Sequence, residues 1–224
     1  FLLNRSSDLT VVTDKWMMGT RNSFFVGIVA TLLATALGTV AALGLSRPHM
    51  PFKAVLMAIL ISPMIVPLII TAAGMFFFYS KIGLTHTYLG LILAHTALGT
   101  PFVVITVTAT LTGFDTNLIR ASQSLGADTM RTFFKVIMPL ILPGVISGGL
   151  FAFITSFDEV VIVMFIGSVE QITIPKQMWA GLRQETSPVI LCMATCLVAL
   201  SIALLTTVEM LRRRSERLRG IKQR

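Results

Sequence analysis

Residues 118–140 read LIRASQSLGADTMRTFFKVIMPL and separate two long apolar runs. Residues 119–125 favour a helix, and Gly126 follows directly, where the absence of a side chain permits a sharp turn. Pro139 lies thirteen positions further on, heads the next apolar run, and suits the first turn of a helix. The stretch therefore predicts two short helices joined at Gly126. Its charged residues are Arg120, Arg131, Lys135 and Asp128.

The composition places the chain in a bilayer. Of its 224 residues, 54% are hydrophobic and 12% are charged, whereas a soluble domain has about 25% charged residues. The net charge of +8 does not indicate nucleic-acid binding, because seven basic residues crowd into positions 212–224 and the apolar runs leave no face for a groove.

Five membrane spans are predicted, since each needs roughly 20 apolar residues. They lie near residues 22–45, 54–79, 89–111, 138–157 and 188–208. Small residues at helical spacing predict close helix packing in the first span (Ala30, Ala34, Gly38, Ala42) and in the fourth (Gly144, Gly148, Gly149). The fold class is therefore an all-α membrane protein, a polytopic helix bundle.

Two prolines, Pro63 and Pro67, interrupt the second span. A proline removes a backbone hydrogen bond and bends a helix, and in a membrane this is tolerated where protein or a water-lined path satisfies the freed carbonyl. Two interpretations stay open: a kink for packing, or a kink that faces a translocation path.

The distribution of basic residues predicts the orientation. The segments 46–53, 112–137 and 209–224 carry twelve Lys or Arg, against six in segments 1–21, 80–88 and 158–187. The first set, with its basic tail 211–224, is expected in the cytoplasm, and segments 1–21 and 158–187 in the periplasm. An outside N-terminus suggests a missing preceding span with residues 1–3 as its tail, hence six spans in the intact protein.

No catalytic set, metal-ligand spacing or phosphate-binding glycine loop is present in the sequence. A transporter without a nucleotide site uses an ion gradient or a separate ATPase. The span interiors contain no acid or base, which ion-coupled transporters usually have. Asp158 and Glu159, at a span end, are either boundary residues that face headgroups or an acidic lip on the path of a cationic solute.

A separate ATPase needs a surface on which to dock, and residues 118–140 offer one. A small, partly apolar surface here suits a groove on a partner. Its residues are Leu118, Ala121, Ser122, Leu125 and Ala127. The alternative is an ordinary interfacial loop.

At these residues the sequence resembles the permease subunits of bacterial binding-protein-dependent ABC importers. Their EAA loop reads Glu-Ala-Ala, three residues, Gly, nine residues, Ile-x-Leu-Pro. Here the frame reads Arg120-Ala121-Ser122, then Gly126, then Val136-Ile137-Met138-Pro139. The spacing is intact, while Arg120 replaces Glu and Ser122 replaces Ala.

The resemblance extends through PFVVITV at 101–107, SFDEVV at 156–161 and ITIPKQMW at 172–179, which look like the spermidine/putrescine branch. It implies a type I ABC importer permease fold of six spans and a non-catalytic subunit in the bacterial inner membrane. A dimer of ABC ATPases, which binds the ATP and Mg²⁺, would dock on the EAA-type loop. A second permease subunit, expected to differ from this chain, and a periplasmic solute-binding protein would complete the transporter; this chain would hold no cofactor.

The solute is less defined. Polyamine permeases tend to carry an acid after the Ser-Pro of the second span, where this chain has Met64. An amino-acid-like solute, an opine or another organic ion is therefore an alternative, and an ion-driven carrier or channel is the alternative from another class. The expected path residues are Asp158, Glu159, Pro63, Pro67 and Trp179.

Overall fold

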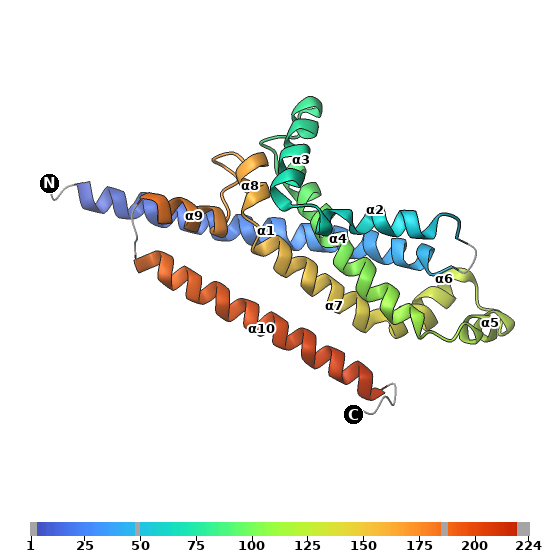
Figure 1. The fold of residues 1–224 in the computed structure, drawn as a ribbon. Helices are drawn as coiled ribbons and strands as arrows, with labels where there is room; N and C mark the ends of the chain where they lie inside the picture. Colours follow the sequence, from blue (N-terminus) through green and yellow to red (C-terminus); the bar gives the residue numbers. More distant parts are fainter. Residues whose placement is uncertain (1–3, 48–49, 185–187, 219–224) are drawn as a thin grey trace.

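The computed structural model describes residues 4–47, 50–184 and 188–218, and in this part of the chain every regular element is a helix. Figure 1 shows long helices lying side by side, with short ones at both ends and on one flank. The elements are α1 (Asn4–Leu45), α2 (Lys53–Ile65), α3 (Leu68–Ile82), α4 (Tyr88–Thr112), α5 (Asn117–Ser124), α6 (Thr129–Thr132), the π-helix η1 (Phe133–Ile137), α7 (Met138–Phe157), α8 (Val161–Ile166), α9 (Ile174–Gln184) and α10 (Pro188–Leu218).

Helices α1, α4 and α7 pack against one another and form the centre of the bundle. The predicted small-residue stripe of α1 is buried, with Ala34 and Ala42 fully inaccessible. A Cβ added at Gly148 of α7 would lie 2.8 Å from the Cα of Val103 of α4, so only glycine permits this approach. The packing predicted from small residues is therefore confirmed on both helices.

Four threonines of α4 bond their hydroxyl groups within the helix. Thr96, Thr100, Thr106 and Thr110 each donate to the carbonyl four residues earlier, at 2.7–2.9 Å. These hydroxyls therefore do not need water inside the bundle.

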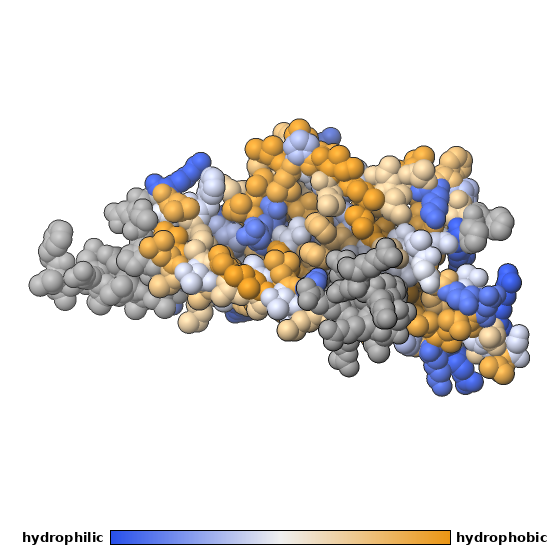
Figure 2. Space-filling view, turned by 60° about the horizontal axis from the view of Figure 1, so that its bottom comes forward, coloured by the Kyte–Doolittle hydropathy of each residue, from blue (hydrophilic) through white to orange (hydrophobic). Residues whose placement is uncertain are grey.

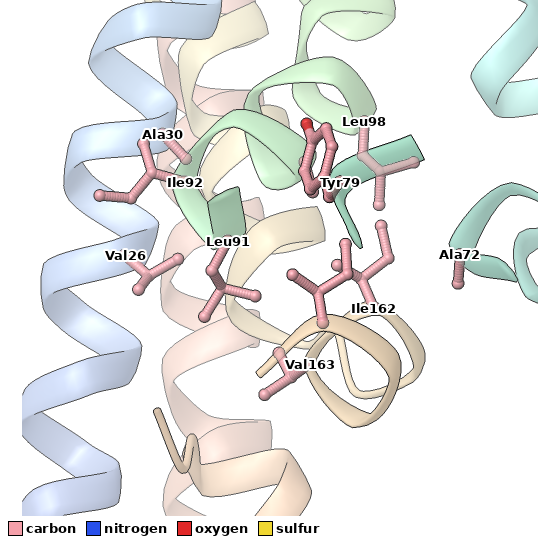
Figure 3. Close-up of a cluster of buried hydrophobic side chains, with 11 residues drawn as sticks. Val26, Ala30, Ala72, Tyr79, Leu91, Ile92, Leu98, Ile162 and Val163 are labelled. Carbon is pink, nitrogen blue, oxygen red and sulfur yellow. The ribbon is translucent and has the colours of Figure 1, made fainter. Parts of the chain in front are cut away.

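A second buried cluster joins the centre to the flank. Figure 3 shows Val26 and Ala30 of α1, Leu91 and Ile92 of α4, and Ile162 and Val163 of α8 around one apolar interior. From α3, Ala72 and Tyr79 contribute to the same cluster. The short helix α8 is thus part of the core rather than a surface loop.

Among the described residues, four helices are long and apolar enough to cross a membrane, and a bent pair makes a fifth span if it counts as one. That pair is α2 and α3, between which the chain direction bends by 104°. The predicted span 54–79 lies within these two helices, and the interruption expected at Pro63 and Pro67 is a break before Pro67 rather than a kink within one helix. The reason is that Val66 is extended and Pro67, which has no N–H, begins a new helix.

Two helices extend beyond the predicted spans. The polar segment before residue 22 continues the helix of the first span, because residues 4–45 contain no proline and polarity alone does not stop a helix. At the fourth span, α6, η1 and α7 form one run, Thr129–Phe157, so the helix begins before the predicted start at residue 138. The proposed tail of a sixth span, residues 1–3, lies outside the described residues.

The visible surface is mostly apolar, as a bilayer requires. Figure 2 shows hydrophobic side chains over much of one face, a group of hydrophilic ones at the end that carries α5 and α6, and smaller hydrophilic groups elsewhere. Arg120, Arg131 and Lys135 are exposed at this end.

Candidate functional site

The turn between α5 and α6 is built around Gly126. The N–H of Ala127 donates to the carbonyl of Ser122 at 3.1 Å, and that of Gly126 donates to the carbonyl of Gln123 at 2.9 Å. This pair of bonds is the Schellman motif that ends a helix, and it holds Gly126 at a φ of 81°. Asp128 then caps α6, since its Oδ1 accepts from the N–H of Arg131 at 2.7 Å. The predicted helix pair joined at Gly126 is present.

One face of α5 presents apolar side chains to its surroundings. Leu118, Ala121 and Leu125 are exposed, and their spacing places them on one side of the helix. Leu125 is 88% exposed, which is unusual for leucine outside lipid. We call Leu118, Ala121 and Leu125 the α5 face. Arg120 and Gly126 are also exposed, and Ala127 is half-buried.

Ser122 points the other way. Its hydroxyl oxygen lies 2.6 Å from that of Thr132, which is buried on α6. The sequence placed Ser122 on the outer surface, whereas the structure gives it an internal bond. The cause is the turn at Gly126, which folds α6 back against α5.

The helix that follows runs without a break from α6 to Phe157. Within it, the N–H of Met138 donates to the carbonyl of Phe133, five residues back, as in a π-helix. Pro139 comes next, has no N–H to donate, and is exposed. Pro139 therefore lies inside a continuous helix rather than at a free helix start, and this helix links the turn after α5 to the opposite end of α7.

That opposite end carries the predicted acidic pair, whose members differ. Asp158 is exposed and ends α7. Glu159 is only 7% exposed, and its Oε1 accepts from the N–H of Ile162 at 2.9 Å. Burial raises the pKa of Glu159, while the bonds from Ile162 and Val161 oppose this effect and the charge of Asp158 adds to it. Glu159 thus holds the start of α8, and Asp158 alone offers an open carboxylate.

The other end of α8 is held by Lys176 of α9. Its Nζ donates to the carbonyls of Val163, Gly167 and Ser168 at 3.1–3.3 Å. Burial lowers the pKa of Lys176. A cation at the C-terminus of a helix is favourable for the helix dipole, so Lys176 and Glu159 fix α8 from both ends.

The segment between α8 and α9 is attached to α1 and α4. Asn22 of α1 donates to the carbonyls of Glu170 at 2.8 Å and Ile172 at 2.9 Å. Tyr88, at the start of α4, donates to Oδ1 of Asn22 at 3.0 Å. The N–H of Ile174 donates to Ser23 Oγ at 2.9 Å. The bonds of Asn22 and Ile174 join residues about 150 positions apart and that of Tyr88 joins residues 66 apart, so local sequence pattern carries no signal for them.

The remaining predicted path residues are spread over the molecule. Pro63 lies inside α2, and Pro67 precedes α3. Trp179 of α9 is 44% exposed, with the guanidinium carbon of Arg183 5.5 Å from the ring centre. Figure 1 shows α9 and α2 on opposite sides of α8, so the five residues do not form one cluster.

A buried polar pair joins α4 and α7. Nδ1 of His95 lies 2.7 Å from Ser156 Oγ. Its Nε2 has no hydrogen-bond partner among the described residues.

Comparison with characterised proteins identifies relatives among polyamine permeases. The chain is 29% identical to the spermidine/putrescine transport system permease protein PotC of Haemophilus influenzae, over 90% of this chain and 79% of that protein. It is 28% identical to the putrescine transport system permease protein PotI of Escherichia coli, over 83% of this chain and 68% of that protein.

Solved structures with the same fold are also ABC transporters. One is an inward-facing methionine transporter MetNI, with a TM-score of 0.65 and 19% identity, covering 95% of this chain and 98% of that one. Another is an amino acid ABC transporter with histidines, with a TM-score of 0.67 and 16% identity, covering 92% and 97%. At these identities the likeness shows the fold alone.

Residues 18–217 match the family described as binding-protein-dependent transport system inner membrane component. The match covers most of the chain, and it selects the ABC importer over the ion-driven carrier that the sequence left open. Such a system includes an ATPase and a solute-binding protein. The chain belongs to this family and is the non-catalytic, multi-pass permease subunit of an inner-membrane ABC importer.

Proposed function

We propose that this chain forms part of the translocation path for a small polar organic solute of the polyamine type. The likeness to PotC and PotI supports this proposal, since both are named for polyamine transport. The exposed carboxylate of Asp158 is the candidate contact for a cationic solute. Trp179, Pro63 and Pro67 are proposed path residues, while Glu159 is proposed to act by holding α8.

The α5 face is proposed to dock on the partner ATPase. The observation that carries this proposal is Leu125, which is 88% exposed at the hydrophilic end of the molecule. The hydrophilic side chains at that end indicate that it lies in water, where exposure of a leucine costs free energy unless a partner covers it. The positive-inside rule favours the cytoplasm for this end, where an ATPase operates. The proposed coupling segment, through which the ATPase would move the permease, also includes Arg120, Ala121, Ser122, Gly126, Ala127 and Pro139.

The solute is tested in proteoliposomes that contain the complete transporter and the binding protein. Uptake of radiolabelled spermidine and putrescine is compared with uptake of a neutral amino acid and an organic anion. We expect ATP-dependent uptake of the polyamines only. Uptake of the amino acid or the anion instead would replace the polyamine proposal, and uptake without the ATPase would contradict the whole mechanism.

Docking is tested with Leu125→Asp, which places a charge on the α5 face. The ATPase should no longer co-purify with the permease. The control is Val169→Asp, because Val169 is also highly exposed, at 75%, but lies between α8 and α9. Equal ATPase recovery with both variants would exclude docking through α5.

A further inference from the structure

A histidine lies in the centre of the bundle, inside a helix that is apolar enough to cross a membrane. His95 of α4 is 1% exposed. Leu91 and Leu98, about one turn away on either side, belong to the buried apolar cluster of Figure 3. An ionisable side chain is costly to place inside a membrane span, so the partner that it meets there indicates its role.

His95 makes one hydrogen bond and lacks another. Its Nδ1 lies 2.7 Å from the hydroxyl oxygen of Ser156 on α7, which is 5% exposed. Its Nε2 is buried without a hydrogen-bond partner among the described residues. A neutral hydrogen bond typically contributes less to stability than an unpaired buried polar group costs. Stability alone therefore does not account for a histidine at this position.

The bond extends the close packing of α4 on α7 by one turn. A Cβ added at Gly99 would lie 2.9 Å from the Cβ of Ala152. His95 precedes Gly99 by four residues and Ser156 follows Ala152 by four, so the bonded pair continues the same register. Contacts between small residues have little directionality, whereas a hydrogen bond requires a short distance and a suitable angle. A shift of Ser156 by about 1 Å would therefore break the bond.

The bonded serine lies next to the acidic pair. Ser156 is the last residue but one of α7, and Asp158 follows two positions later. Glu159 comes next and is fixed in turn, since its Oε1 accepts from the N–H of Ile162 at 2.9 Å. The exposed carboxylate of Asp158 thus lies between two anchored residues. Its position relative to α4 depends on the bond at Ser156.

We infer that His95 is a positioning residue for transport. Through its bond to Ser156 it holds the adjacent end of α7 on α4, and so sets where the carboxylate of Asp158 meets the solute. This inference rests on the proposed function, in which Asp158 is the contact for a cationic solute. His95 itself is buried between two helices and acts without touching the solute. Only its Nδ1 takes part.

The shapes of the substituted side chains test this assignment. His95→Asn keeps a polar amide atom where Nδ1 lies, His95→Gln keeps one where Nε2 lies, and His95→Phe keeps the ring without either nitrogen. Ser156→Ala removes the partner with little change in volume. Thr100→Val is the matched control, because the Thr100 hydroxyl donates within α4, to the carbonyl of Thr96 at 2.7 Å.

The first measurement is hydrogen exchange at amides 156–160 of the complete transporter in lipid nanodiscs. His95→Phe, His95→Gln and Ser156→Ala should each speed exchange there about fivefold, the effect of one lost hydrogen bond. The double variant His95→Phe/Ser156→Ala should be no faster, because the same bond is lost. His95→Asn and Thr100→Val should exchange like the unchanged chain. Unchanged exchange in Ser156→Ala, additive effects in the double variant, or protection by His95→Gln but not by His95→Asn would overturn the inference.

The second measurement is ATP-dependent uptake of spermidine into proteoliposomes that contain the complete transporter and the binding protein. Asp158→Asn should slow uptake several-fold in the otherwise unchanged chain. It should have no further effect in His95→Phe, because His95 acts through Asp158. Equal slowing by Asp158→Asn in both backgrounds would contradict the inference. Hydrogen exchange requires no solute, so a transporter that does not accept spermidine would refute the polyamine proposal, while exchange still decides the role of His95.

Discussion

The hydroxyl oxygens of Ser122 and Thr132 lie 2.6 Å apart, which joins α5 by a hydrogen bond to the helix that continues into α7. Thr132 is buried, so its hydroxyl has little access to water. The bond thus connects the proposed docking helix to a membrane span directly, in addition to the connection through the turn at Gly126.

Ser122→Ala should loosen this connection. Leaving the buried Thr132 hydroxyl without its partner costs about 1–3 kcal/mol. We expect less solute taken up per ATP hydrolysed. The control is Ser124→Ala, because the Ser124 hydroxyl bonds only within α5, to the carbonyl of Arg120. An unchanged ratio of uptake to hydrolysis in Ser122→Ala would show that the bond plays no part in coupling.

Gly126→Val should strain the turn without a steric clash. No atom lies within 4 Å of a Cβ added at Gly126, but its φ of 81° is unfavourable for a branched residue by about 1–3 kcal/mol. ATP hydrolysis should persist while uptake falls. Gly113→Val is the matched control, since that position is equally open and has a φ of −94°. Equal uptake by the two variants would exclude a role for the turn's geometry.

Gly148→Ala should weaken the contact between α7 and α4. The added methyl group would lie 2.8 Å from the Cα of Val103, and such overpacking costs about 1–3 kcal/mol. The midpoint of thermal unfolding in detergent should fall. Gly44→Ala, where no atom lies within 4 Å of the added Cβ, should leave it unchanged or slightly higher. A midpoint unaffected by Gly148→Ala would mean that the helices separate at little cost.

Stability should depend on pH through Glu159. Burial raises its pKa above the usual 4.5, so the native state holds this proton more tightly than the unfolded state. Its contribution is fully present below pH 4.5 and is lost as the pH rises through the raised value. Glu159→Gln should remove that loss in thermal unfolding measured between pH 4.5 and 7. Asp158→Asn, at an exposed position, should retain it; identical pH profiles for both variants would contradict the assignment.

Asn22→Asp should release the segment between α8 and α9. The substitution keeps the shape but replaces a donor by a carboxylate, which repels the carbonyls of Glu170 and Ile172. The loss should be about 2–4 kcal/mol, and amides 167–174 should exchange hydrogen faster. Asn117→Asp, on exposed α5, is the control. Unchanged exchange at 167–174 would show that other contacts hold the segment.

Much of the bundle could be predicted from local pattern. Ala34 and Gly148 were expected at helix contacts because small side chains at helical spacing allow two helix backbones to approach closely in a membrane. Gly126 was expected in a turn because few other residues adopt that conformation. At these positions the residue type itself indicates the local backbone geometry, so a single sequence is sufficient to predict the helix contact or the turn.

The rest depends on contacts between distant segments. Pro63 and Pro67 indicated an interruption, but not its angle of 104°, which depends on the surroundings of α3. Asp158 and Glu159 are adjacent and both acidic, yet only Glu159 is buried, because the chain turns between them to start α8. Asn22 was read only as the first residue of a span, since its partners lie about 150 positions away.

The continuous run Thr129–Phe157 has 29 residues and would extend about 44 Å as a straight helix. In the proposed coupling this run would act as a lever: pivoted near its middle, it would carry Asp158 toward one side when α5 moves toward the other. A tilt of about 10° over this length moves each end by about 4 Å in opposite directions. Because α8 begins just beyond Asp158 and packs on α3, a push at one membrane surface would then reach the bent helix pair as a pull near the other.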